Sequence, residues 1–190
     1  MTLEQILERL SVPAPSGVAD GVALGTGLSD GFGVFESPLG PVVVAFNPLG
    51  VSAVDLFTKG FEERFAERFR RPLLEARPPR DWEDLIIRAL AEGTPGALPV
   101  DFRSVTSFQR LVLEQTAGIP RGETRSYGWL AGRTGRPGAA RAVGQTMARN
   151  PVPLVIPCHR VVLSDGRIGH YGLGGSERKR RLLRVEGAIC

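Results

Sequence analysis

The residue types with the most chemical potential stand side by side at Cys158 and His159, within the segment 150–162. A thiol beside an imidazole can act as a nucleophile next to a base, although such partners usually come from distant parts of a chain. A lone buried cysteine is more often a small apolar side chain. Prolines at 151, 153 and 157 stiffen the approach, because each fixes φ and removes a backbone donor. The apolar run 154–156 predicts a short buried strand leading to the cysteine.

Only one other histidine and one other cysteine occur in the chain, His170 and Cys190. On count alone, these four side chains could form a zinc site. Neighbouring ligands at 158 and 159 fit a tetrahedron poorly, so we expect no metal and no cofactor. Cys190 is expected to be a free, exposed thiol.

The charge of the chain is divided between its two halves. Residues 1–95 carry 9 Lys and Arg against 14 Asp and Glu, a net −5, whereas residues 96–190 carry 15 against 6, a net +9. A basic C-terminal half predicts a polyanionic partner, although a basic surface without a partner is the alternative. Two cysteines exclude a disulfide framework and favour a reduced, cytoplasmic setting. We expect neither a signal peptide nor a membrane span.

The N-terminal half predicts a small sheet with helices. Thr2 is placed to cap a helix over 3–10, and residues 12–30 predict a loop or a weak strand. Strands over 32–35, 42–46 and 51–56 with short turns predict an antiparallel meander. Phenylalanines at 57, 61, 65 and 69 predict the core face of one helix. A loop over 72–80 and a helix over 82–92 follow, with Asp81 as its N-cap and Gly93 as its stop.

The C-terminal half predicts mostly helices. The linker 93–99 separates a domain over 1–95, with 1–30 an extension of unknown role, from a domain over 101–190. Thr106 or Ser107 caps the first helix, Ser126 caps a short helix containing Tyr127 and Trp129, and a tight turn over 135–138 leads to a helix over 139–149. Two helices joined by a glycine-containing turn in a basic region indicate a helix-turn-helix, although many helical hairpins bind nothing.

Several side chains of this half are candidates for contact with DNA or with the thiol. Ala139 and Ala140 are small enough to let a helix approach DNA closely, and Arg141 beside them can reach bases. A flexible glycine-rich loop over 169–175 carries Tyr171. The last helix, over 177–186 with Ser176 as its cap, places Glu186 on the same face as two leucines, so Glu186 is expected to point inward. A buried carboxylate needs a partner, and His159 is the candidate.

Residues 107–187 resemble the catalytic domain of the O6-alkylguanine-DNA alkyltransferases. The similarity is carried by Arg125-Ser-Tyr-Gly-Trp-Leu-Ala131, Ala140-Arg-Ala-Val-Gly144, Asn150-Pro-Val-Pro, Ile156-Pro-Cys-His-Arg-Val-Val162 and the terminal Arg178-Lys…Leu-Leu…Glu186-Gly. Residues 37–56 resemble the N-terminal domain of the family more weakly, and residues 1–30 are not covered. The resemblance implies an α+β fold: a small ribonuclease-H-like sheet and helix domain, then a mostly helical, winged-helix-like DNA-binding catalytic domain.

The resemblance also implies an activity. A damaged guanine is flipped out of double-stranded DNA, and its O6-alkyl group passes irreversibly to Cys158, once per molecule and without a cofactor. His159 takes the thiol proton through a bridging water, and Glu186 orients His159 as the third member of a relay. The partner is duplex DNA containing O6-alkylguanine, and the protein is expected to be a monomer.

Further roles follow from the same resemblance. Tyr127 donates a proton to the leaving base, Asn150 braces the turn that holds the cysteine, and Arg141 fills the gap left by the extruded base. The loop 171–179 is one residue longer than in the family, which leaves open whether the backbone N–H of Gly172 meets O6. Trp129 is expected to be a core residue. The substrate pocket is assigned to Tyr171, Gly172, Val161 and Lys179, and the DNA contacts to Arg141, Ala139, Ala140 and Arg149.

Three other classes of protein fit the pattern less well. A non-catalytic lesion-binding protein, like the alkyltransferase-like proteins, would carry another residue in place of Cys158. A helix-turn-helix transcription regulator would need no Pro-Cys-His-Arg pocket and is usually dimeric. A cysteine hydrolase would need a remote histidine and an oxyanion site, and His170 is the only other histidine.

Overall fold

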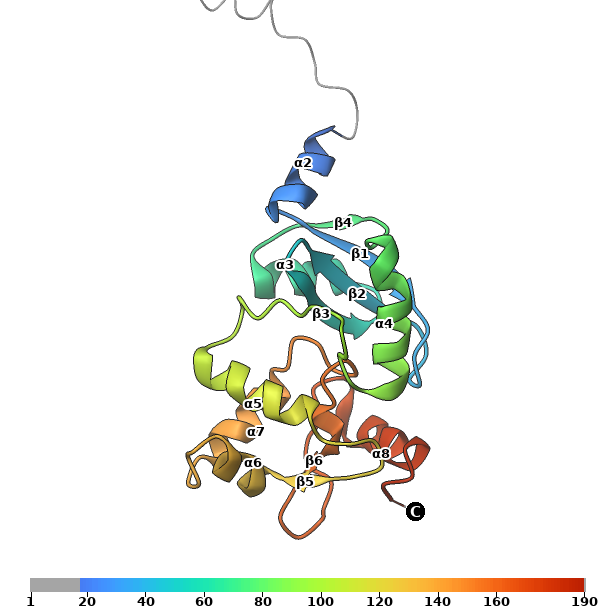
Figure 1. Ribbon diagram of the computed structural model, residues 1–190. Coiled ribbons are helices and arrows are strands. Elements are labelled where there is room, and N and C mark those ends of the chain that lie inside the picture. Colours follow the sequence, from blue (N-terminus) through green and yellow to red (C-terminus); the bar gives the residue numbers. More distant parts are fainter. Residues whose placement is uncertain (1–17, 190) are drawn as a thin grey trace, which may run out of the picture.

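The computed structural model describes residues 18–189, with a sheet and its helices in the upper half and a helical unit below them (Figure 1). The helix expected over 3–10 and the thiol of Cys190 lie outside the described residues. The expected α+β class is confirmed, with strands concentrated in the N-terminal half and helices in the C-terminal half.

The sheet contains β1 (Asp30–Phe35), β2 (Val42–Asn47), β3 (Gly50–Leu56) and β4 (Leu73–Glu75) in the order β3-β2-β1-β4. The antiparallel meander of the first three strands is confirmed. The expected loop over 72–80 is wrong in part, because β4 pairs there in parallel with β1. Strand β4 has three residues, two of them partly buried and one exposed. This pattern is too short for a strand to be predicted from the sequence.

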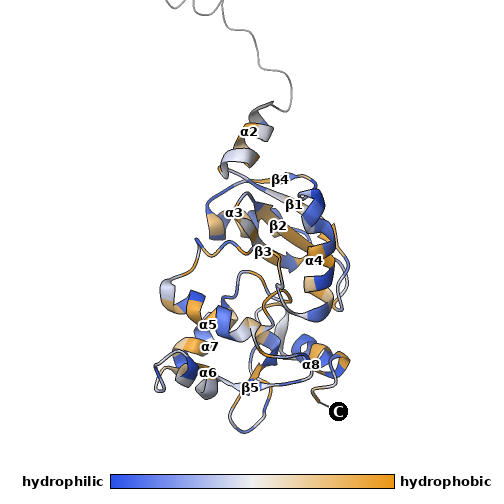
Figure 2. Ribbon diagram, in the orientation of Figure 1, coloured by the Kyte–Doolittle hydropathy of each residue, from blue (hydrophilic) through white to orange (hydrophobic). Residues whose placement is uncertain are grey.

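Both faces of the sheet are covered, as alternation along β2 requires. Val42 and Val44 belong to the core that includes Ile86 of α4 (Arg80–Glu92), whereas Val43 and Ala45 pack with Phe65 of α3 (Phe61–Phe69). Figure 2 shows the resulting apolar band along β2. A strand buried on both sides reads as the continuous apolar run Val-Val-Val-Ala-Phe rather than as an alternating one.

Three helix boundaries in this half differ from the prediction. Residues Val18–Thr26 form α2, where a loop or weak strand was expected. Helix α3 begins at Phe61, so Phe57 lies before it and is 50% exposed, outside the core to which it was assigned. Helix α4 has Pro79 as its N-cap, with Asp81 inside the first turn, where its charge favours the helix dipole. Gly93 ends α4 in the left-handed conformation, as predicted.

The lower half contains α5 (Ser107–Ala117), α6 (Tyr127–Arg133), α7 (Ala140–Ala148) and α8 (Gly175–Val185). Thr106 caps α5 in a capping box with Gln109, and Ser126 caps α6. Helices α6 and α7 pack on each other and on α5, which confirms the helix-turn-helix. Strands β5 (Arg125–Ser126) and β6 (Val161–Val162) pair in parallel beside it. The cap of α8 is Gly174 rather than Ser176, and α8 ends one residue earlier than expected, with Glu186 as its C-cap.

The segment between the halves is attached to the edge of the sheet. Val51 donates to the carbonyl of Pro99 at 2.9 Å, and Asp101 donates back to the carbonyl of Val51 at 2.9 Å. The Asp101 carboxylate also accepts from Asn47, which donates to Asp30, so a buried polar network fixes the start of the lower half. One continuous core runs from the sheet into the helices of the lower half.

Candidate active site

The backbone before Cys158 forms a turn rather than the expected strand. Leu154 has a φ of 73°, and Pro153 forms only an isolated bridge to Ile156. The prediction of burial was right, since residues 154–156 are at most 1% exposed, but the prediction of a strand was wrong. Asn150 holds the turn, because its Nδ2 donates to the carbonyl of Ile156 at 2.9 Å and its Oδ1 accepts from Val152 at 3.1 Å. This is the bracing role expected of Asn150.

Cys158 begins the short 3-10 helix η1 (Cys158–Arg160) and is 3% exposed. Burial raises the pKa of the thiol, and this effect outweighs the Asn150 side chain and the Lys179 ammonium, both of which lower it. Cys158 is therefore held as a thiol at neutral pH. A transfer reaction at this sulfur needs a group that removes the proton as the reaction proceeds.

His159 is placed to be that group. Its Nε2 lies 2.9 Å from Oε1 of Glu186, whereas Nδ1 is buried and has no hydrogen-bond partner among the described residues. Burial lowers the pKa of His159 and the Glu186 carboxylate opposes that effect without cancelling it. With Nε2–H assigned as the donor to the carboxylate, neutral His159 presents a lone pair on Nδ1. The predicted proximity of Glu186 to His159 is confirmed.

Arg160 is the functional residue that reasoning from the sequence missed. It is 1% exposed, and its Nε and Nη2 donate to the two oxygens of Glu186 at 2.9 and 2.8 Å. Its other hydrogen bonds go to the carbonyls of Gly93 and Ile119 through Nη1 and of Glu92 through Nη2. Burial would raise the pKa of Glu186, but hydrogen bonds from His159 and Arg160 lower it to about 2. Glu186 is therefore ionised at neutral pH.

The signal for Arg160 was present in the motif around Cys158, but its partners come from remote segments. The guanidinium reaches the end of α4, some seventy positions earlier in the chain. A Cβ at Gly93 would collide with the guanidinium of Arg160, so the glycine that ends α4 also admits this arginine. Arg160 thus ties the N-terminal half to the carboxylate that orients His159.

The expected pocket residues gather around the thiol. Lys179 is fully buried, donates to the carbonyl of Val161, and lies 5.8 Å from the centre of the Tyr127 ring. Burial lowers the pKa of Lys179 to about 8, against the raising effect of Cys158. Tyr171 is 2% exposed and packs edge-on to His159 with ring centres 6.3 Å apart. Tyr171 therefore lies inside the pocket, packed against His159.

Two glycines shape this pocket. A Cβ at Gly169 would lie 2.9 Å from the Tyr127 hydroxyl, and a Cβ at Gly172 would lie 2.7 Å from the carbonyl oxygen of Ala148. The loop therefore passes against α6 and the end of α7 at distances that only glycine permits. His170, between them, is exposed and takes no part in the site.

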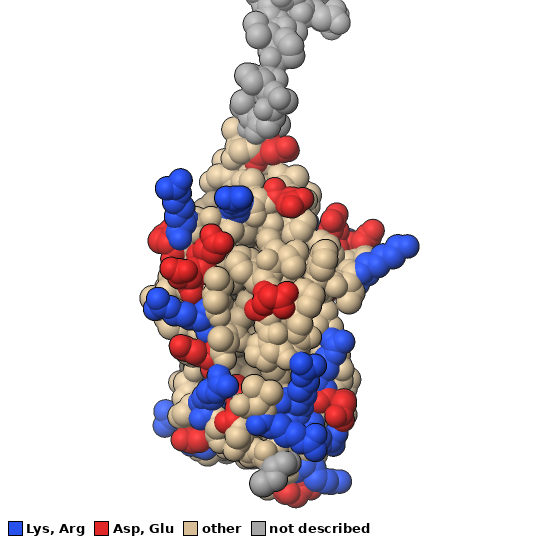
Figure 3. Space-filling view, turned by 90° about the vertical axis from the view of Figure 1, so that its right-hand side faces the viewer, with Lys and Arg blue, Asp and Glu red and all other residues tan. Residues whose placement is uncertain are grey.

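The candidate DNA contacts lie along α7. Ala139 is its N-cap and Ala140 its first residue, and the exposed Arg141 follows. Arg149 is the C-cap, so it lies at the opposite end of the helix from Arg141. The expected core position of Trp129 is wrong, because the residue is 42% exposed. The guanidinium groups of Arg125 and Arg133 lie 5.4 and 5.7 Å from the centre of its indole. Figure 3 shows further arginine side chains gathered on the lower half, over α8.

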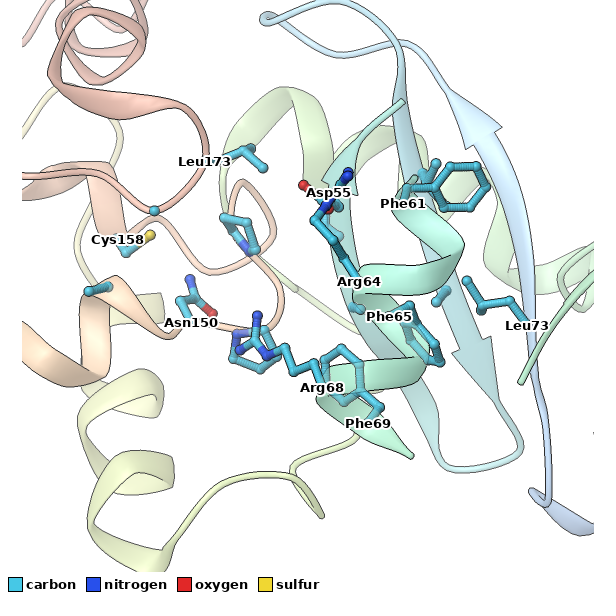
Figure 4. Close-up of a pocket in the computed structure, with 18 of the residues that line it drawn as sticks. Asp55, Phe61, Arg64, Phe65, Arg68, Phe69, Leu73, Asn150, Cys158 and Leu173 are labelled. Carbon is cyan, nitrogen blue, oxygen red and sulfur yellow. The ribbon is translucent and has the colours of Figure 1, made fainter. Parts of the chain in front are cut away.

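A cavity of about 290 Å³ separates the thiol from the sheet. In Figure 4, Cys158 and Asn150 lie on one side, and Arg68, Asp55 and the phenylalanines of α3 lie on the other. Within residues 18–189, no three His, Cys, Asp or Glu side chains are arranged to hold a metal ion. Over the same residues, every helix is too short or too polar to cross a membrane.

Comparisons with known proteins cover both halves of the chain. Residues 107–188 match the family described as 6-O-methylguanine DNA methyltransferase, DNA binding domain. A methylated-DNA–protein-cysteine methyltransferase of Methanosarcina acetivorans is 34% identical over 169 residues, 83% of this chain and 98% of that protein. One from Mycobacterium tuberculosis is 51% identical over 81 residues, 43% of this chain and 48% of that protein. The crystal structure of Mycobacterium tuberculosis OGT in complex with DNA has a TM-score of 0.66 and 31% identity, covering 83% of this chain and 93% of that chain.

Proposed function

The chain belongs to the methylated-DNA–protein-cysteine methyltransferase family, and we propose that it repairs O6-alkylguanine in DNA by moving the alkyl group to Cys158. The observation that carries the assignment of Cys158 is the relay behind it. A buried thiol stands next to a neutral imidazole whose Nδ1 is available and whose Nε2 is held by an ionised carboxylate. These are the groups that activation of a protonated nucleophile requires.

The reaction forms a bond between Cys158 Sγ and the alkyl carbon and breaks the bond between that carbon and O6. The thiol proton passes to Nδ1 of His159 through a water, because neighbouring side chains seldom hydrogen-bond directly. Glu186 stabilises the cation that His159 becomes. A thiol with a raised pKa has less than a few per cent thiolate at neutral pH, so proton removal and displacement are coupled.

The leaving guanine departs with the electron pair of the broken bond and needs a proton. Tyr127, at the N-terminus of α6, donates this proton. Burial raises the pKa of Tyr127, so its hydroxyl is protonated before the base departs. Lys179, positively charged below a pKa of about 8, lowers the pKa of Cys158 and so favours the thiolate. The product is a thioether, which no group in the site can cleave, so each molecule reacts once.

The target base reaches the buried thiol by leaving the duplex. Extrusion costs a few kcal/mol, which a side chain inserted in place of the base offsets in part. Arg141, exposed at the N-terminal end of α7, is our candidate for that side chain. Ala139 and Ala140 allow the end of α7 to approach a groove of the DNA. Arg149 contacts the DNA phosphate backbone. We further propose that the protein acts as a monomer in the cytoplasm, where Cys158 stays reduced.

A non-catalytic lesion-binding protein is the alternative, and the intact nucleophile and relay disfavour it. The test is a duplex with a single O6-methylguanine, mixed with increasing amounts of protein and assayed for restored guanine by chromatography of the digested strand. We expect restoration to saturate at one lesion per protein molecule, and Cys158→Ser to bind the duplex without restoring guanine. Binding by the wild-type protein without restoration would contradict the proposal.

A further inference from the structure

The N-terminal half touches the segment that braces the active-site turn at two points. Val54 of β3 donates to the carbonyl of Pro151 at 2.9 Å, and Arg68 of α3 donates through Nη2 to the carbonyl of Arg149 at 2.5 Å. These two acceptors stand immediately before and after Asn150. We propose that Arg68 is a positioning residue for alkyl transfer, which fixes Asn150 under Cys158 by holding the end of α7.

The position of Asn150 matters to the thiol in two ways. Its side chain closes the turn from Val152 to Ile156, which sets the place of Cys158. It also lowers the pKa of Cys158, against the burial that raises it. A displacement of Asn150 therefore moves the nucleophile and makes its proton harder to remove.

Arg68 is suited to this task by its charge and its surroundings. The carbonyl of Arg149 stands at the C-terminal end of α7, where the helix dipole favours a cation. Asp55 attracts the Arg68 guanidinium, and the Phe69 ring lies 5.0 Å from it. Figure 4 shows the Arg68 side chain extending from α3 toward Asn150, along one wall of the cavity. Arg68 does not act on the thiol by charge, since Lys179 is the cation that lowers the pKa of Cys158.

Arg64 provides a matched control one turn earlier on the same helix. It is exposed like Arg68 and lines the same cavity, but its hydrogen bonds go to Asp55, Thr58 and the carbonyl of Lys59. All of these partners lie in the N-terminal half. Loss of Arg64 therefore removes a guanidinium from the cavity without removing a bond to the catalytic half.

The experiment compares Arg68→Met, Arg68→Lys and Arg64→Met in the full chain carrying Cys190→Ser, so that Cys158 is the single thiol. Single-turnover transfer at saturating duplex gives the rate constant, a titration gives the Kd for DNA, and alkylation by iodoacetamide across pH gives the reactivity of the thiol. We expect Arg68→Met to slow transfer about tenfold or more, because the nucleophile is misplaced. The thiol titration should shift upward, because a displaced Asn150 no longer lowers the pKa of Cys158. The Kd should stay within about twofold, Arg68→Lys should recover part of the rate, and Arg64→Met should match the parent.

Of these measurements, only the rate of alkyl transfer rests on the proposed function. A parent protein that transfers no alkyl group would refute the proposed function, while the iodoacetamide arm would still decide the role of Arg68. Three results would overturn that role: an Arg68→Met variant with parental rates, a loss confined to the Kd for DNA, or equal losses of rate and thermal stability in Arg68→Met and Arg64→Met.

Discussion

At the scale of single residues, the Glu186 carboxylate is shared between two cationic partners. Its Oε1 accepts from both His159 and Arg160, and its Oε2 accepts from Arg160. Hydrogen bonds from His159 and Arg160 keep the carboxylate ionised in a buried site, where burial alone would favour the neutral acid. An ionised Glu186 in turn fixes the tautomer of His159, so Arg160 supports catalysis without touching the thiol.

The rate of transfer should depend on pH through two groups. His159 must be neutral to accept a proton, and since its pKa is lowered from 6.5, the acidic limb should lie below pH 6.5. Lys179 must be charged, so the alkaline limb should lie near its pKa of about 8. Single-turnover rates across pH measure both limbs. Lys179→Met should be about tenfold slower near neutral pH, because the cation that lowers the pKa of Cys158 is lost. The variant should also lose the alkaline limb. A wild-type rate that rises steadily beyond pH 9 would contradict this assignment.

Glu186→Gln should destabilise the protein in a pH-dependent way. The folded pKa of about 2 lies below the ordinary value of 4.5, so the stabilisation is complete above pH 4.5 and is lost as pH falls toward 2. Removing one member of a buried pair costs about 3 kcal/mol or more, because Arg160 is left without its carboxylate. Urea unfolding at pH 7 and at pH 4 measures the difference, which should shrink at the lower pH. Glu177→Gln, with its side chain 77% exposed and paired to Arg180, should change little.

At the scale of elements, the sequence pattern predicted those helix ends and strands that neighbouring residues determine. The caps at Thr106 and Ser126, the stop at Gly93 and the strands of the meander follow from short-range rules, and all were predicted correctly. The 154–156 turn was missed because three apolar residues fit a strand or a turn equally well, and the prolines around them decide it.

Long-range contacts account for the remaining errors. The partners of Arg160 lie on α4 and after α5, so no local signal reveals them. Trp129 was assigned to the core because of its type, whereas two neighbouring arginines cover the indole at the surface. The relay itself was predicted because the motif resembles a known family, and the inward-facing position of Glu186 was supported independently by the helix pattern.

Gly172→Ala tests how tightly the pocket loop packs on α7. A Cβ there would lie 2.7 Å from the backbone oxygen of Ala148, so the loop carrying Tyr171 must shift. We expect a loss of about 1–3 kcal/mol of unfolding free energy, as for other overpacked sites, and slower transfer. Gly132→Ala is the control, since no atom lies within 4 Å of its Cβ and alanine favours the α6 helix by about 0.5–1 kcal/mol. An unchanged Gly172→Ala protein would show that the loop is free to move.

At the scale of the whole molecule, the two halves share a core but differ in charge. The sheet and its helices carry the acidic balance, and the catalytic half carries the basic one, so the DNA partner belongs to the lower half in Figure 1. The N-terminal half contributes through contacts rather than through charge. Arg160 reaches α4, and Val54 and Arg68 reach the segment around Asn150.

Binding to undamaged duplex should be governed by phosphate contacts. Each phosphate neutralised adds about −0.9 to the slope of log affinity against log salt concentration, and a half with a net charge of +9 should engage several phosphates. We expect a slope steeper than about −3 by fluorescence anisotropy, with little dependence on sequence. Affinity that stays flat between low and high salt would show that the basic surface is not the DNA interface.

Cys158 should be the alkyl-accepting residue of a single-use transferase. The most direct test is intact mass followed by peptide mapping, after the protein is mixed with a duplex that carries one O6-methylguanine. We expect a gain of one methyl group per protein, located on Cys158 and absent from Cys190. A methyl group on any other residue, or a protein that binds the lesion and gains no mass, would contradict it.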